Sequence, residues 1–332
     1  MRTTGIVAAV FLSLVAQARA QEAPSPDATV LSDVVVRTRP TQEAAHDFVG
    51  RVGAPAPGRG LALWRREVCP GVVNLKREAA QAIVDRIVEA AASLELRTGE
   101  PGCQPNVIVI FTHDGRGLVR TMNADNPRLF RQNVTGMHRD VGAFRDFLDS
   151  DRPVRWWSLS IPVDSETGLI AVRMPGDPAG GMVDKDLADM LGCSPSDCAI
   201  GAAPIINRSG PGRLNTQVVD SLFKTMIIVD MDMIRDINTT QLGDYIAFIS
   251  LAQLDARAET QGFDTILNLF SGGAQQSLTD WDRAYLAALY ATRPLRASPG
   301  AQNGAVADVM TRELRAIALS YQEERGAPRM SR

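Results

Sequence analysis

An amphipathic helix followed by a buried strand constrains the fold of this chain most. In residues 74–94, NLKREAAQAIVDRIVEAAASL, apolar side chains recur every three or four positions, which predicts a helix with one face in a core. After a short strand and a Gly-Pro turn that holds Cys103, residues 107–111 form a mostly β-branched run, typical of a strand in the middle of a sheet. The core positions expected on the helix are Ala80, Ile83, Val84, Ile87, Val88 and Ala91.

Helical and strand patterns also follow one another in the next segments. Helices are expected over residues 115–123 and 138–149, and strands over PVRWWSLSIPV (153–163) and DSLFKTMIIVD (220–230). This order favours an α/β (α+β) fold, a mixed sheet packed on helices, over a helix bundle. Residues 163–216 are rich in Gly, Pro, Ser and Asp and predict a long loop-rich insertion.

Three further helices are expected towards the end of the chain. TTQLGDYIAFISLAQLD (239–255) is the first, and LTDWDRAYLAALY (278–290) is the second. In the second, Thr279 is a good N-cap, and Asp280 and Asp282 complement the helix dipole in the first turn. Residues 296–332 are expected to form a C-terminal helix and tail.

The first twenty residues have the three parts of a secretory signal. Arg2 lies in a short basic start, residues 5–16 are apolar, and Ala18-Arg19-Ala20 fits a cleavage site. About twelve apolar residues are too few to cross a hydrocarbon core of roughly 30 Å. We therefore expect a soluble periplasmic or secreted protein that begins at Gln21 and has no integral membrane segment after cleavage.

The mature chain would divide into an arm and one domain. Residues 21–60 are expected to be a flexible arm with a β-prone run (31–38) and a short helix (41–52), followed by a domain over 61–295. Losing the two arginines of the signal changes the net charge from −3 to −5 (−3 − 2), which argues against nucleic acid as a partner.

Four cysteines, an even number, suit an exported chain with disulfides. Three pairings exist. Cys193 and Cys198 flank a Ser-Pro-Ser-Asp turn that brings them together, which leaves Cys69 to pair with Cys103. A four-thiolate zinc site would need C-x-x-C knuckles, and the sequence has none.

The order of these segments resembles the zincin-like fold, particularly the metzincin-type peptidases and related bacterial families. In that fold a core helix, a mixed sheet and an edge strand precede an active helix with H-E-x-x-H, a turn and a closing helix. Here residues 239–253 stand at the active helix, DTILNLF (264–270) at the turn and residues 278–290 at the closing helix. The resemblance covers about residues 70–295 and implies an edge strand near residues 222–229 that aligns a peptide.

The metal ligands of that family are missing. In the natural register Gln241 and Tyr245 stand at the two histidine positions, and Leu242 stands in place of the glutamate. The three histidines of the chain, at positions 46, 113 and 138, lie elsewhere. Calcium is an alternative for Asp230, Asp232 and Asp236, with Asp244 one turn into the next segment. The ordered D-x-D-x-D-G spacing is absent, however, and helix capping explains part of the cluster. We expect no metal and no cofactor.

The candidate cleft comprises Gln241, Asp244, Tyr245 and His113, with no residue assigned as catalytic. Asp244, if buried among apolar neighbours, needs a partner such as an arginine, so a structural polar network is favoured over catalysis. His113 follows the 107–111 strand at a usual place for functional groups. Trp156 and Trp157 should point to opposite faces of their strand, and an outward one would mark a ligand groove or a subdomain contact.

The resulting hypothesis is a non-catalytic zincin-like domain that binds a peptide or an envelope partner along the edge strand near residues 222–229. The alternative is a hydrolase that uses non-metal residues of the same cleft, with Asp244, Tyr245 and His113 as candidates.

Overall fold

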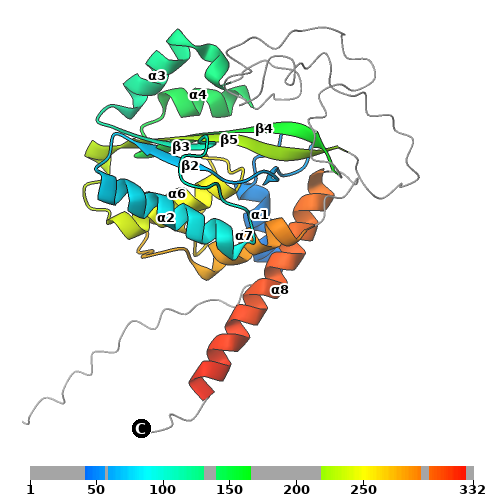
Figure 1. The fold of residues 1–332 in the computed structure, drawn as a ribbon. Helices are drawn as coiled ribbons and strands as arrows, with labels where there is room; N and C mark the ends of the chain where they lie inside the picture. The colour runs from blue at the N-terminus through cyan, green and yellow to red at the C-terminus, as the bar shows by residue number, and fades with distance from the viewer. Residues whose placement is uncertain (1–41, 57–58, 131–139, 166–217, 293–298, 327–332) are drawn as a thin grey trace, which may run out of the picture. The chain divides into compact units, whose positions relative to one another are not determined.

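The structure, a computed structural model, describes residues 42–56, 59–130, 140–165, 218–292 and 299–326. In these residues a mixed five-stranded sheet lies between two layers of helices (Figure 1). The α/β class expected from the alternation of helical and strand patterns is confirmed. The expected signal segment, nearly all of the 163–216 insertion and the Cys193–Cys198 pair lie outside the described residues.

Four strands of the sheet are parallel and one is antiparallel. β2 (Pro70–Val73), β3 (Val107–Thr112) and β5 (Val218–Asp230) lie side by side in that order. The short β1 (Leu63–Trp64) pairs with an earlier part of β5, on the same side as β3. β4 (Val154–Asp164) runs antiparallel along the other side of β5 and forms an edge of the sheet (Figure 1). The β-branched run of β3 thus lies inside the sheet, as predicted.

The prediction that residues near 222–229 form an edge strand is wrong. These residues belong to β5, which is paired with β4 on one side and with β1 and β3 on the other. The sequence misled because β4 and β5 are both apolar over most of their length, and hydropathy does not separate an edge strand from an inner one when helices cover both faces. Pro162 in β4 marks the true edge, since proline cannot donate a ladder hydrogen bond.

The larger core lies between one face of the sheet and five helices: α1 (Gln42–Val52), α2 (Arg77–Ser93), α6 (Thr239–Leu251), α7 (Asp280–Ala291) and α8 (Pro299–Gly326). On α2 the buried residues are Ile83, Ile87, Ala90 and Ala91, so three of the six expected positions are confirmed, while Ala80, Val84 and Val88 are half-buried. Every residue from Gln241 to Leu251 is buried, in keeping with a helix that is apolar nearly all round. The helix predicted over 239–255 ends at Leu251 because Ala252 is extended and Leu254 forms a β-bridge with Gly53.

The smaller core lies on the opposite face of the sheet. It is covered by α3 (Gly115–Asp125), the 3-10 turn η1 (Pro127–Phe130) and α4 (Val141–Asp149). Trp157 packs there against Phe144 with ring centroids 5.0 Å apart, whereas Trp156 packs in the larger core against Tyr245 at 6.2 Å. The two tryptophans therefore point to opposite faces of the sheet, as predicted, but neither is exposed.

The N-terminal helix α1 belongs to the domain, although the sequence placed residues 42–52 in the arm. Its apolar face is fully buried, and Phe48 contacts the rings of Phe263, Trp281 and Tyr285. Gln42 Nε2 also donates a hydrogen bond of 2.7 Å to Asp308 on α8. The first and last described helices are thus packed together.

The predicted Cys69–Cys103 disulfide is confirmed. The two Cα atoms lie 6.1 Å apart, and the bond joins the chain just before β2 to the loop just before β3. Disulfides of this kind persist mainly in exported proteins. In the described ranges no helix is long and apolar enough to cross a membrane.

A buried ion pair at the start of β5 gives a test of pH dependence. Arg59 Nε lies 3.0 Å from Oδ2 of Asp220, whose side chain is 1% exposed. Burial raises the pKa of Asp220 to about 6, against the opposing effect of Arg59. The native protein therefore binds a proton between about pH 4 and 6 that the unfolded chain does not, so stability falls as pH rises through this window.

We expect Asp220→Asn to remove the loss of stability that accompanies ionisation of Asp220. This loss amounts to roughly 3 kcal/mol at 1.4 kcal/mol per pKa unit. Urea unfolding at several values between pH 4 and 8, followed by tryptophan fluorescence, measures it. Asp47→Asn, at an exposed carboxylate of α1, is the control and should keep the wild-type slope. Equal slopes for Asp220→Asn and the wild type would contradict the assignment.

Candidate functional site

Asp244 is held in a structural polar network rather than in a cleft. Its side chain is 1% exposed; Oδ1 accepts a 2.6 Å hydrogen bond from Arg86 Nε, and Oδ2 accepts one of 2.9 Å from Leu278 N. Gly243 allows this contact, because a Cβ there would lie 2.8 Å from Arg86 Cγ. Asp244 therefore ties α6 to α2 and to the segment before α7, with an arginine as its partner.

Gln241 and Tyr245 are likewise committed to packing. Gln241 forms a capping box with Asn238 and donates a 2.8 Å hydrogen bond to the carbonyl oxygen of Gln275. The Tyr245 ring lies between Trp156 and Phe270, and burial raises the pKa of its phenol well above the usual range. The residues at the expected metal-ligand positions thus face the core.

His113 lies apart from these three residues. Its ring is exposed, and Nδ1 lies 3.3 Å from Asp232 Oδ2 in the 3-10 turn η3 (Met231–Met233) that follows β5. Arg235, and to a lesser extent His113, lower the pKa of Asp232. In the described residues no hydrogen bond or ion pair joins His113 to the predicted α6 residues, so the grouping of these four residues in one cleft stays a prediction.

Of the acidic residues weighed for calcium, Asp230 serves as a cap, whereas Asp232 forms ion pairs with His113 and Arg235. Asp230 accepts hydrogen bonds from Gly115 N at 3.0 Å and from Asp232 N at 3.1 Å, at the starts of α3 and η3. Across the part of the chain that the structure describes, no three His, Cys, Asp or Glu side chains are grouped to hold a metal ion.

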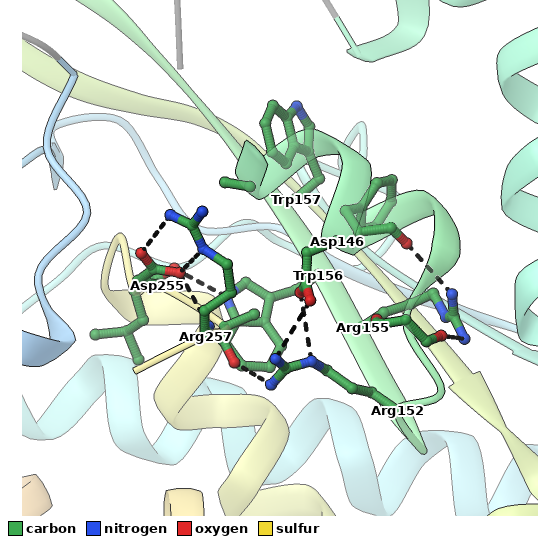
Figure 2. A pocket seen from close by; sticks show the side chains of 12 residues that line it. Asp146, Arg152, Arg155, Trp156, Trp157, Asp255 and Arg257 are labelled. Atoms are coloured by element: carbon green, nitrogen blue, oxygen red, sulfur yellow. Dashed lines mark hydrogen bonds and ion pairs between the residues drawn. The ribbon is translucent and has the colours of Figure 1, made fainter. Parts of the chain in front are cut away.

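A narrow pocket lies where β4 begins. Residues from α4 and the turn after it form one wall, the start of β4 the floor, and residues 254–257, just after α6, the other wall (Figure 2). The lining comprises Ala143, Asp146, Phe147, Ser150, Arg152, Arg155, Trp156, Trp157, Leu254, Asp255, Ala256 and Arg257. Because α4 covers one face of the sheet and residues 254–257 lie on the other, the pocket follows the sheet edge.

Two arginines bridge the walls of this pocket. Arg152 donates to the carbonyl oxygen of Ala256 on one wall and lies 3.4 Å from Asp146 on the other. Arg257 pairs with its neighbour Asp255 at 2.8 Å and reaches across to Asp140, at the start of α4, at 2.6 Å. Figure 2 shows the contacts of Arg152 and the Arg257–Asp255 pair. These bridges hold α4 and residues 254–257 together.

A third arginine, Arg155, is buried under α4. It donates to the carbonyl oxygens of Phe147 at 3.3 Å and Ser150 at 2.8 Å. Burial lowers the pKa of its guanidinium. Arg155 therefore fixes the turn after α4 and leaves Arg152 and Arg257 as the exposed cations of the pocket.

The backbone of β4 presents hydrogen-bonding groups to this pocket. Asp230 N donates to the carbonyl oxygen of Pro153 at 2.8 Å, and the register continues with Val154 opposite Val229. Since bonded and non-bonded pairs alternate in an antiparallel ladder, Arg155 and Trp157 bond to β5, while the N–H and C=O of Val154 and Trp156 point away from it. In the described residues β4 pairs with β5 alone.

The sequence did not predict this pocket. Arg152, Asp146 and Arg257 are charged residues in three separate segments, and in one dimension they resemble ordinary solvated positions. The nearest signal in the sequence was the tryptophan pair, which lies in the strand that forms the floor of the pocket.

Comparison of the chain with protein-family models, with curated proteins and with solved structures finds no match. The zincin-like resemblance therefore stays a prediction.

Proposed function

We propose that the chain is a zincin-like domain without metal chemistry, which binds an extended peptide as an added strand along the outer edge of β4. The observation that carries the proposal is the outward N–H and C=O of Val154 and Trp156 on the edge of β4, where Trp156 lines a pocket with a helix on one side and a loop on the other. An extended peptide gains main-chain hydrogen bonds from such an edge, and side-chain pockets supply specificity. This position replaces the one expected on residues 222–229.

Two further observations support the proposal. α6 packs under the sheet, and η4 (Ile266–Phe270) and α7 follow in the order expected for the turn and the closing helix. The disulfide supports an exported chain, for which the peptide would belong to a periplasmic or envelope protein. The alternative hydrolase has less support, because Asp244, Tyr245 and His113 each have other contacts, and no hydrogen bond or ion pair in the described residues joins His113 to the other two.

Amide hydrogen exchange tests the proposal at single-residue resolution. An array of twelve-residue peptides supplies binders, and each binder is then added to the oxidised protein. We expect binding to slow exchange at Trp156, whose N–H points into the pocket, with little change at Arg155 and Trp157, whose N–H groups already bond to β5.

The other edge strand, β2, is the internal control and should not change. Protection at β2 instead of β4 would place the peptide elsewhere. Failure of every peptide to bind below about 1 mM would refute strand addition.

A further inference from the structure

We infer that the peptide accepted along β4 is acidic and that Arg152 and Arg257 receive its carboxylates; this rests on the proposed strand addition. The pocket is lined by three arginines and two aspartates, so its lining carries one net positive charge. The side chains of Arg152 and Arg257 are 35% and 36% exposed, whereas those of Asp146 and Asp255 are 23% and 24% exposed. Within the lining the two cations are thus more exposed than the two anions, while Asp140, which pairs with Arg257 at the start of α4, is 57% exposed.

The two arginines differ in how firmly they are held. Arg257 forms close ion pairs with Asp255 and Asp140. Arg152 has only long contacts with Asp146, at 3.4 and 3.5 Å, besides its hydrogen bond to the carbonyl oxygen of Ala256. A carboxylate that accepts two parallel N–H bonds from one guanidinium is a stronger partner than this arrangement. Arg152 is therefore the first to exchange its partner.

Because Arg152 lies at the edge of β4, its weaker pairing gives the pocket a preference for acidic peptides. The contact between Arg152 and Ala256 crosses the edge of β4 where an added strand would lie, so the strand has to displace it. A peptide carboxylate restores the lost partner, whereas a neutral side chain leaves a partly buried guanidinium unpaired and a lysine adds repulsion. Alternate side chains of a strand lie on one face, about 6.6 Å apart, so carboxylates at positions i and i+2 could meet both arginines.

The test uses three matched versions of each array binder, with Glu, Gln or Lys at the positions that face the pocket. Isothermal titration should show the Glu version binding at least tenfold tighter than the Gln version, with no measurable binding of the Lys version. Raising the salt concentration from 50 to 300 mM should shrink the preference for Glu over Gln, because exposed charges are screened.

Variants of the protein assign the preference to Arg152. Arg152→Gln should remove the difference between the Glu and Gln peptides. Asp146→Asn removes the ion-pair partner of Arg152, so the Glu peptide should bind this variant several-fold more tightly than the wild type. A gain in affinity cannot come from misfolding, so this variant keeps the test valid if Arg152→Gln does not fold. Arg120→Gln is the matched control, since Arg120 pairs with Asp149 of α4 outside the pocket lining. This variant should leave the affinities of the Glu and Gln peptides unchanged.

The outcomes separate the two proposals. Equal binding of the Glu and Gln peptides with protection at Trp156 would overturn the acidic preference and leave strand addition intact. A preference for Glu that survives Arg152→Gln and does not respond to Asp146→Asn would overturn the role of Arg152. Absence of binding by all peptides would overturn both proposals.

Discussion

Replacing Asp282 with alanine is expected to destabilise the protein by about 4 kcal/mol, because a buried carboxylate with four donors would be lost. Its oxygens accept hydrogen bonds from Thr265 Oγ1 at 2.5 Å, Ile266 N at 2.8 Å, and the N and Oγ1 of Thr279, both at 2.9 Å. Asp282 also completes the capping box of α7 with Thr279. The deletion would leave buried donors unpaired at the start of α7 and at η4.

Urea unfolding measures the loss of stability in Asp282→Ala. Asp282→Asn keeps one acceptor oxygen and should lose about half as much as the alanine variant. The control is Asp264→Ala, an exposed neighbour whose backbone carbonyl is retained, with an expected change within about 0.5 kcal/mol. Similar midpoints for Asp282→Ala and Asp264→Ala would show that the network contributes little.

Removal of the Cys69–Cys103 disulfide is expected to cost a similar amount. The bond closes a loop with a sequence separation of 34, for which the chain-entropy model gives about 4 kcal/mol. The double variant Cys69→Ala/Cys103→Ala should therefore unfold at a clearly lower urea concentration than the oxidised wild type. Its fold should persist, because both positions lie in connecting segments and neither interrupts a helix or strand.

Thiol labelling and peptide mapping accompany this measurement. The native protein should yield a peptide pair joined through Cys69 and Cys103, and Cys69→Ala alone should lose nearly as much stability as the double variant. A pairing of Cys69 with Cys193 or Cys198 would contradict both the sequence argument and the structure.

Local patterns in the sequence predicted most elements of the described fold. The periodicity of residues 74–94 and the β-branched run at 107–111 placed α2 and β3, and Thr279 was predicted as the N-cap that it is. These predictions succeed because helix periodicity, β-branching and capping act over a few residues. The arrangement of strands is not local, and for this reason β5 was mistaken for an edge.

The candidate site was harder to predict because its parts are distant in sequence. Asp244 was predicted to need a partner, and an arginine was named as a candidate, but nothing in the sequence singles out Arg86, 158 positions away. Arg257 and Asp140 meet only because α4 and residues 254–257 lie on opposite faces of the same edge. Such a pair depends on the complete fold.

The packing of α1 against α8 has a consequence for the time at which the chain can fold. Gln42 and Asp308 are 266 positions apart, and Phe48 of α1 needs Trp281 and Tyr285 of α7 to bury its ring. During synthesis from the N-terminus, α1 is complete long before either partner exists, so the larger core closes last. Contacts this distant in sequence form slowly. Until α7 and α8 have been made, the growing chain therefore lacks the partners that bury Phe48 and bind Gln42.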